Sequence, residues 1–184
     1  MTARTWLAGV LGALAMFIWL FLAHGVLGLG ESGIQQIPNE APLLATMQST
    51  IPAHGTYMFP NMDPKDQDAN MKKVASGPSG LLIYFPTRNF SFPAALMIEY
   101  VTQFVAVMIA LYLLSLTRVS TFAGRVAFFA LIGLCVACAD NISNWNWYGF
   151  SGSYTLAACF TGWVGYVLAG MVVAGLKVGG AEAS

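Results

Sequence analysis

Three ionisable residues and one amide lie inside long apolar stretches of the sequence. Glu99 stands seven residues beyond Phe92, where one such stretch begins, and Gln103 follows four residues later on the same helix face. His24 lies near the end of the first stretch, and Asp140 lies at the end of the third. Intramembrane charges are costly and rare, and they usually face the interior of a helix bundle. Their chemistry would be ligand binding or a response to protons.

Two interpretations of this polar group are open. In the first, His24 and Glu99 satisfy each other as a structural pair while Asp140 caps nearby polar groups, because buried polar groups must be hydrogen-bonded. In the second, the group forms a proton-responsive or ligand-binding pocket. The candidate ligand-binding residues are His24, Glu99, Gln103, Asp140, Asn141, Trp145 and Trp147.

The stretch CADNISNWNWYGFSGSYT, residues 138–155, mixes aromatic rings with asparagine, serine and one aspartate directly after an apolar segment. Such rings are typical of the boundary between membrane and water. Stacking faces beside directional hydrogen-bonding groups are also typical of binding sites. We therefore expect residues 142–153 to form an aromatic turn that either anchors the chain at the membrane surface or covers the layer containing Glu99.

All three cysteines, Cys135, Cys138 and Cys159, lie within apolar stretches. Cys135 and Cys138 have the spacing of a redox motif, but a reactive thiolate needs an electropositive and partly exposed setting. A copper site would add thioethers such as Met58 and Met62, yet these groups are expected at different depths and methionine commonly fills apolar surfaces. We predict small packing residues here, with no metal, no cofactor and no catalytic residue.

The elements that must position these residues follow from composition. The 184-residue chain is 57% hydrophobic and 9% charged, whereas soluble domains are roughly 25% charged. This composition predicts a membrane protein, and the formal net charge of zero argues against a nucleic-acid partner. Four apolar stretches approach the ~20 helical residues that cross a bilayer. They are Thr5–Gly28, Phe92–Leu116, Phe122–Ala139 and Tyr154–Leu176.

The predicted fold is an all-α membrane protein, a four-transmembrane-helix bundle with a small extracytoplasmic α/β insert between helices 1 and 2. Residues 1–29 hold helix 1, residues 30–91 form the insert, and residues 92–184 hold helices 2–4 in one integrated domain. Small residues four apart let helix backbones approach closely in lipid. We expect these pairs to pack the bundle internally: Ala8/Gly12, Gly9/Ala13, Gly133/Ala137, Gly165/Ala169 and Gly170/Ala174.

The insert carries its own folding signals. Asn39 is a candidate helix cap, and the segment DPKDQD predicts a second helix with Asp63 as its N-cap and an end near Ser76. Two short strands are predicted at Thr56–Phe59 and Gly80–Phe85. Because a two-stranded sheet is marginal alone, its apolar side chains must meet the bundle, the bilayer or another protein. The candidate partner-binding residues are Ile83 and Phe85.

Basic residues in the short loops predict the orientation. With four spans, these residues fall on one side, which is then cytoplasmic: Arg4, Arg118, Arg125 and Lys177. The expected location is a bacterial inner membrane, with both termini in the cytoplasm and residues 30–91 in the periplasm.

Three segments, TYMFPNMDPKD, SGPSGLLIYFP and SNWNWYGFSGSYTLA, carry a resemblance. Together they resemble a group of bacterial four-span membrane proteins that has no assigned function. The resemblance covers most of the chain and implies a four-helix bundle with an outer insert. It implies no reaction, cofactor or catalytic residue.

Two functions are expected from these features. The first is a non-enzymatic accessory or scaffold subunit that binds a larger membrane assembly or forms a homo-oligomer through its helix faces and outer sheet. The alternative is a small membrane ligand-binding protein, a transporter, a sensor or an enzyme, that takes a lipid or quinone-like molecule at the outer mouth of the bundle. The chain contains neither a recognisable nucleophilic triad nor a glycine-rich phosphate loop.

Overall fold

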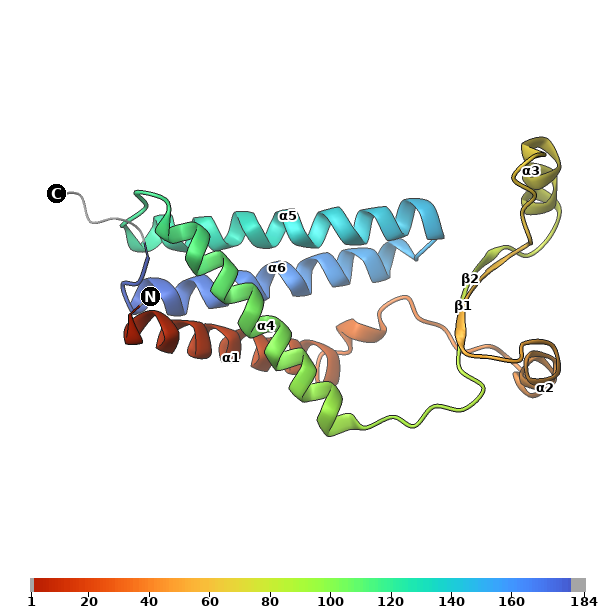
Figure 1. The fold of residues 1–184 in the computed structure, drawn as a ribbon, viewed down its shortest axis with the longest axis horizontal. Coiled ribbons are helices and arrows are strands. Elements are labelled where there is room, and N and C mark those ends of the chain that lie inside the picture. The colour runs from red at the N-terminus through yellow and green to blue at the C-terminus, as the bar shows by residue number, and fades with distance from the viewer. Residues whose placement is uncertain (1, 180–184) are drawn as a thin grey trace. The chain divides into compact units, whose positions relative to one another are not determined.

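The computed structural model describes residues 2–179, which are mostly helical (Figure 1). Four helices are long and apolar enough to cross a membrane: α1 (Ala3–Gly25), α4 (Phe92–Ser115), α5 (Phe122–Tyr148) and α6 (Gly152–Gly175). The shorter elements are η1 (Leu29–Glu31), α2 (Ala41–Thr50), β1 (Gly55–Phe59), α3 (Gln67–Ser76) and β2 (Gly80–Tyr84). The chain forms two compact units, a helical unit that holds the four long helices with η1, and a smaller unit, Gln35–Phe90.

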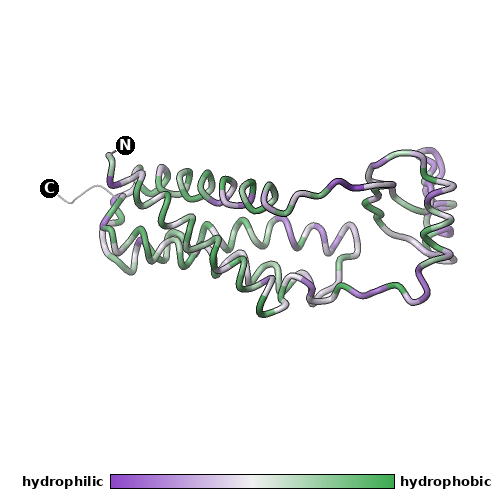
Figure 2. Tube along the Cα trace, turned by 90° about the horizontal axis from the view of Figure 1, so that it is seen from below, coloured by the Kyte–Doolittle hydropathy of each residue, from purple (hydrophilic) through white to green (hydrophobic). Residues whose placement is uncertain are grey.

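The four predicted apolar helices are confirmed, and Figure 2 shows mostly apolar residues along the helical unit. Side-chain caps set where three of them begin. Thr2 Oγ1 accepts a hydrogen bond from Thr5 N at the start of α1, Thr121 Oγ1 does the same for α5, and Ser151 Oγ does so for α6. These side chains satisfy amide groups that the first turn of a helix leaves free.

The predicted aromatic turn at residues 142–153 is wrong over its first half, because α5 continues without a break to Tyr148. Asparagine and serine are weak helix formers, but they do not stop a helix that is already formed. Asn141 Nδ2 bonds Ala137 O at 2.8 Å, one turn earlier in the same helix. The helix ends only at Gly149, whose φ of 74° lies in the left-handed region that glycine adopts freely.

The helical unit is tightly packed in one half of its length. Its buried apolar core joins the first half of α1, the second halves of α4 and α6, and the start of α5. Small residues allow this approach: a Cβ added to Gly12 would lie 3.8 Å from the Cα of Ala169, and one added to Gly170 would lie 2.7 Å from the Cβ of Phe129. The prediction that small residues pack the bundle internally is therefore confirmed at these positions.

The smaller unit holds both predicted strands. β1 and β2 pair antiparallel, with Thr56 opposite Ile83 and Met58 opposite Leu81. Among residues 35–90, all of which the structure describes, Tyr84 is the one buried side chain. The sheet is thus formed as predicted, but it encloses almost no core.

Two predicted helix caps in this unit are wrong. Asn39 does not cap α2, because it has a φ of 51° and the residue at the cap position is Glu40. Asp66, not Asp63, caps α3, with Asp66 Oδ1 accepting from Ala69 N at 2.9 Å. Asp63 Oδ1 instead accepts from Lys65 N, two residues on, and this local turn delays the helix. The predicted end of α3 at Ser76 is confirmed.

Candidate functional site

The other half of the helical unit contains a cavity of about 470 Å³ that is lined by all four long helices. We call it the polar cavity. It gathers five of the seven residues that the sequence nominated for ligand binding: His24, Glu99, Gln103, Asp140 and Asn141. Met16 and Tyr166 line the cavity and also belong to the packed core, so they form the boundary between the two halves.

His24 and Glu99 do not form the pair that the first sequence interpretation required. His24 Nδ1 lies 2.8 Å from the carbonyl oxygen of Leu20, and Glu99 Oε1 accepts from Gln103 Nε2 at 2.6 Å. Each side chain therefore bonds its own helix, one turn away.

A short strap of chain after α1, residues 26–34, lies against one side of the exposed His24 ring. η1 turns back so that a Cβ added to Gly30 would clash with His24 Cδ2. Farther along, Ser151 Oγ donates to Gly33 O at 3.3 Å, which ties this segment to the start of α6. Hydropathy could not predict this contact between the strap and the imidazole.

Three polar side chains of the cavity are more than nine-tenths enclosed by protein. Gln103, Thr161 and Tyr166 keep only 8%, 3% and 8% of their exposure. Within residues 2–179, the hydroxyls of Thr161 and Tyr166 make no hydrogen bond. Unlike the hydroxyl of Tyr84, neither is completely buried. Both residues line the polar cavity.

Sequence reasoning missed Thr161 and Tyr166. A single threonine or tyrosine in an apolar helix carries little signal, because a helical threonine commonly bonds the carbonyl one turn earlier. Their position next to Gly162 and Gly165, on the face of α6 with small residues, is the feature that indicates an inward orientation. Trp19 was missed as well, although its Nε1 donates to Thr161 O at 2.8 Å and fixes α1 against α6.

Trp145 and Trp147 do not line the polar cavity. They lie on the last turns of α5 and are 51% and 75% exposed. The hypothesis that the aromatic stretch covers the Glu99 layer therefore has no support from their placement. Asp140 and Asn141, one to two turns earlier, are the residues of this stretch that reach the cavity.

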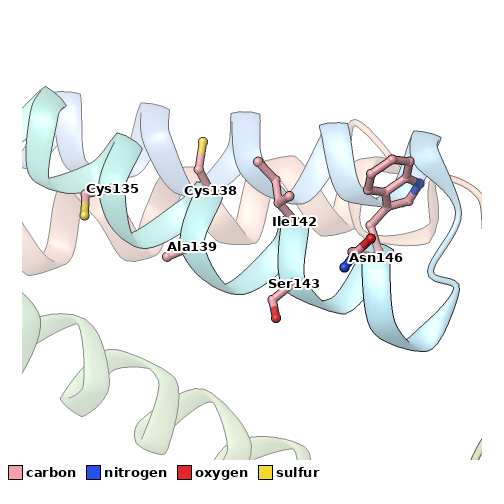
Figure 3. A pocket seen from close by; sticks show the side chains of 7 residues that line it. Cys135, Cys138, Ala139, Ile142, Ser143 and Asn146 are labelled. Atoms are coloured by element: carbon pink, nitrogen blue, oxygen red, sulfur yellow. The ribbon is translucent and has the colours of Figure 1, made fainter.

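A second hollow lies along one side of α5 and is lined by residues of that helix alone, from Cys135 to Asn146 (Figure 3). A hollow with a single wall has no opposing groups that could enclose a ligand. In Figure 3 the thiols of Cys135 and Cys138 point in opposite directions, which does not fit a redox pair. Among residues 2–179, no three His, Cys, Asp or Glu side chains come close enough to hold a metal ion.

The basic residues of the helical unit lie away from the polar cavity. None of its lining residues is lysine or arginine. Arg125, at the start of α5, is instead buried in the packed half, where its Nε and Nη2 both donate to Gly179 O at 3.1 and 3.0 Å. The carboxylates of Glu99 and Asp140 therefore face the cavity without a lysine or arginine beside them.

The two candidate partner-binding residues belong to the smaller unit. Ile83 is 65% exposed on the same face of the sheet as Met58 and Leu81. Phe85 is 42% exposed, and its ring stacks on His54 with Arg88 5.1 Å above its centroid. Ile83 is thus free on its face, whereas Phe85 is engaged within its own unit.

No family model matches this chain, and neither a curated protein nor a solved structure is similar to it at a significant level. The resemblance to bacterial four-span proteins stays a prediction.

Proposed function

We propose that this chain is an integral membrane protein that binds one small amphipathic molecule in the polar cavity. The observation that carries this proposal is the convergence of five polar side chains, nominated from sequence, in one cavity lined by four apolar helices. Its volume of about 470 Å³ falls in the range of ~300–1,000 Å³ that is common for small-molecule sites. The site holds no recognisable nucleophile with an activating base, so binding rather than catalysis is proposed.

The cavity has the two kinds of wall that an amphipathic molecule needs. Polar groups from Glu99 and Asp140 lie in it together with apolar side chains such as Met16, Leu20 and Val136. Glu99, Asp140 and Val136 are exposed, so the cavity is open rather than sealed. Figure 1 shows α4 and α5 separating toward this half, which supports entry between these two helices from the bilayer.

The proposed location is a bacterial inner membrane, with the polar cavity in the extracytoplasmic half of the bundle. The support is the distribution of charge, because short loops rich in lysine and arginine stay in the cytoplasm. In the helical unit, Arg4, Arg118, Arg125 and Lys177 flank one end of the long helices, whereas Glu99 and Asp140 lie toward the other. Residues 35–90 would then lie in the periplasm, and lipid or quinone-like molecules would reach the cavity from the outer leaflet.

Filling the cavity tests the proposal. A Cβ added to Gly162 would meet only Ala137 Cβ, at 3.6 Å, so Gly162→Leu should extend into the cavity without a clash at its base. We expect small molecules extracted from the purified wild-type protein to include a species that is absent from Gly162→Leu. Gly175→Leu is the matched control, because it lies on the same helix with nothing within 4 Å. Identical extracts from wild type and Gly162→Leu would refute the binding function.

A second candidate function, an accessory subunit of a membrane assembly, is favoured by the smaller unit. Its sheet exposes Met58 and Ile83 on one face, although two strands without a core are marginal. A second membrane protein that covers this face would supply the missing burial. Ile83→Asp should then release a co-purifying subunit while the helical unit stays folded. Met71→Asp is the control, because Met71 is 67% exposed on α3 of the same unit but does not belong to the sheet. A subunit composition unchanged by Ile83→Asp would exclude this sheet as the contact.

A further inference from the structure

Carboxyl and amide oxygens give the polar cavity several hydrogen-bond acceptors, alongside the second N–H of each amide and the hydroxyls of Thr161 and Tyr166, which can donate. Gln103 Nε2 donates to the Glu99 carboxylate, and Asn141 Nδ2 donates to Ala137 O. Because a carboxylate and a carbonyl oxygen only accept, these contacts fix which end of each amide is nitrogen. The two amide oxygens remain without a donor among residues 2–179.

His24 is engaged with its own helix and with the chain that follows it. Its Nδ1 lies 2.8 Å from Leu20 O, so Nδ1 carries the proton that is donated to this carbonyl. A Cβ added to Gly30 would lie 3.1 Å from His24 Nε2, so this nitrogen lies next to η1.

The groups that line the cavity from each helix include two carboxyl groups and no lysine or arginine. α4 contributes Glu99, α5 contributes Asp140, α1 contributes His24, and α6 contributes the hydroxyls of Thr161 and Tyr166. No lysine or arginine lines it, and no ion pair joins His24 to Glu99. Carboxylates next to apolar walls are stabilised by a cation more strongly than they are in water.

We propose that the ligand of the polar cavity carries a protonated primary amine attached to an apolar portion, an inference that rests on the binding function proposed above. An ammonium group offers three N–H donors and one positive charge, which match the two amide oxygens and the two carboxyl groups. The hydrocarbon portion would lie along Met16, Leu20 and Val136. The amine belongs either to a free lipophilic amine or to the ethanolamine headgroup of a lipid.

Matched eight-carbon probes test this inference on the full-length protein in phosphatidylglycerol nanodiscs. Octylammonium, octyltrimethylammonium and octanol share one tail but differ in charge and in N–H donors. Bound probe is measured by mass spectrometry after subtraction of empty nanodiscs. We expect octylammonium to bind the wild type about tenfold more tightly than octanol, since hydrogen bonds to charged groups are worth more than neutral ones. Octyltrimethylammonium, which has no N–H donor, should fall between them.

Two isosteric variants test whether the carboxyl groups of the cavity bind octylammonium. Glu99→Gln and Asp140→Asn should each weaken octylammonium binding by about tenfold or more while octanol binding is unchanged, because only the charge is removed. Asp68→Asn, on exposed α3, is the matched control and should change nothing. Helical circular dichroism and a single elution peak establish that each variant is folded.

The outcomes separate the inference from the function on which it rests. If octanol binds as tightly as octylammonium and Gly162→Leu blocks both, the cavity binds amphiphiles but the amine is refuted. Equal binding of octyltrimethylammonium and octylammonium would likewise refute recognition through N–H donors. If no probe binds the wild type better than it binds Gly162→Leu, the binding function itself is refuted.

Lipid composition then distinguishes the two sources of the amine. Replacing part of the phosphatidylglycerol by phosphatidylethanolamine should weaken octylammonium binding to the wild type, but not to Glu99→Gln, if the lipid headgroup occupies the cavity. Unchanged affinity in both membranes would assign the cavity to a free lipophilic amine.

Discussion

At the scale of single residues, Arg125 has a structural contact that its sequence position does not reveal. Arg125 is a topological signal in the sequence, but in the structure it is only 7% exposed. Its guanidinium uses two nitrogens to bind one carbonyl, Gly179 O, just beyond the end of α6. Because the last carbonyls of a helix and the chain that follows have no helical partners, this contact satisfies backbone that would otherwise be buried without a donor.

Arg125→Lys should lower the free energy of unfolding by about 1–2 kcal/mol, because lysine keeps the charge but has no planar fork to bind one oxygen twice. Thermal unfolding in mild detergent, followed by circular dichroism, would show this loss of stability as a lower unfolding temperature. Arg118→Lys is the control, since that side chain is exposed. Equal midpoints for both variants would show that the Gly179 contact contributes nothing measurable.

At the scale of elements, the link between α5 and α6 is short because α5 runs on through polar sequence. Only Gly149 to Ser151 separate the two helices, and Ser151 both caps α6 and donates to Gly33 O on the strap. The link between α5 and α6 thus holds the strap that contacts His24. The positive φ of Gly149 ends α5 and so sets the position of the link between α5 and α6.

Gly149→Ala should destabilise the protein by about 1 kcal/mol or more, because alanine is strained at a φ of 74° while the added Cβ meets nothing within 4 Å. Gly152→Ala, three residues on, also has open space but no positive φ, so it should be neutral or slightly stabilising. Denaturation midpoints of the two variants provide the comparison. A loss of stability in Gly152→Ala alone would contradict the assignment of the helix end.

At the scale of the whole molecule, orientation decides which compartment the polar cavity faces. In a background with Cys135, Cys138 and Cys159 replaced by alanine, Lys72→Cys should react with a membrane-impermeant maleimide added to intact cells. Ser120→Cys, in the exposed link between α4 and α5, should react only after lysis. Labelling in the reverse order would place the cavity on the cytoplasmic side.

The sequence by itself determined the four long helices, the two strands and most of the polar residues of the cavity. These features follow from local properties: hydropathy adds up along a segment, strand patterns are set by neighbouring residues, and an ionisable residue in an apolar helix is conspicuous wherever it lies. The end of α5 was predicted too early, because asparagines and serines precede Gly149, the glycine with positive φ that ends the helix.

Only the tertiary structure decided how those residues are used. It divided the bundle into a packed half and a hollow half, because small residues such as Gly12 and Gly170 bring the helices together where the core lies. It paired Glu99 with Gln103 and His24 with Leu20 instead of with each other, and it brought Thr161 and Tyr166 to the same cavity. Whether a side chain bonds one turn away in its own helix or reaches across to another helix depends on distances between helices to within a few tenths of an ångström, and spacing along a single chain does not encode those distances.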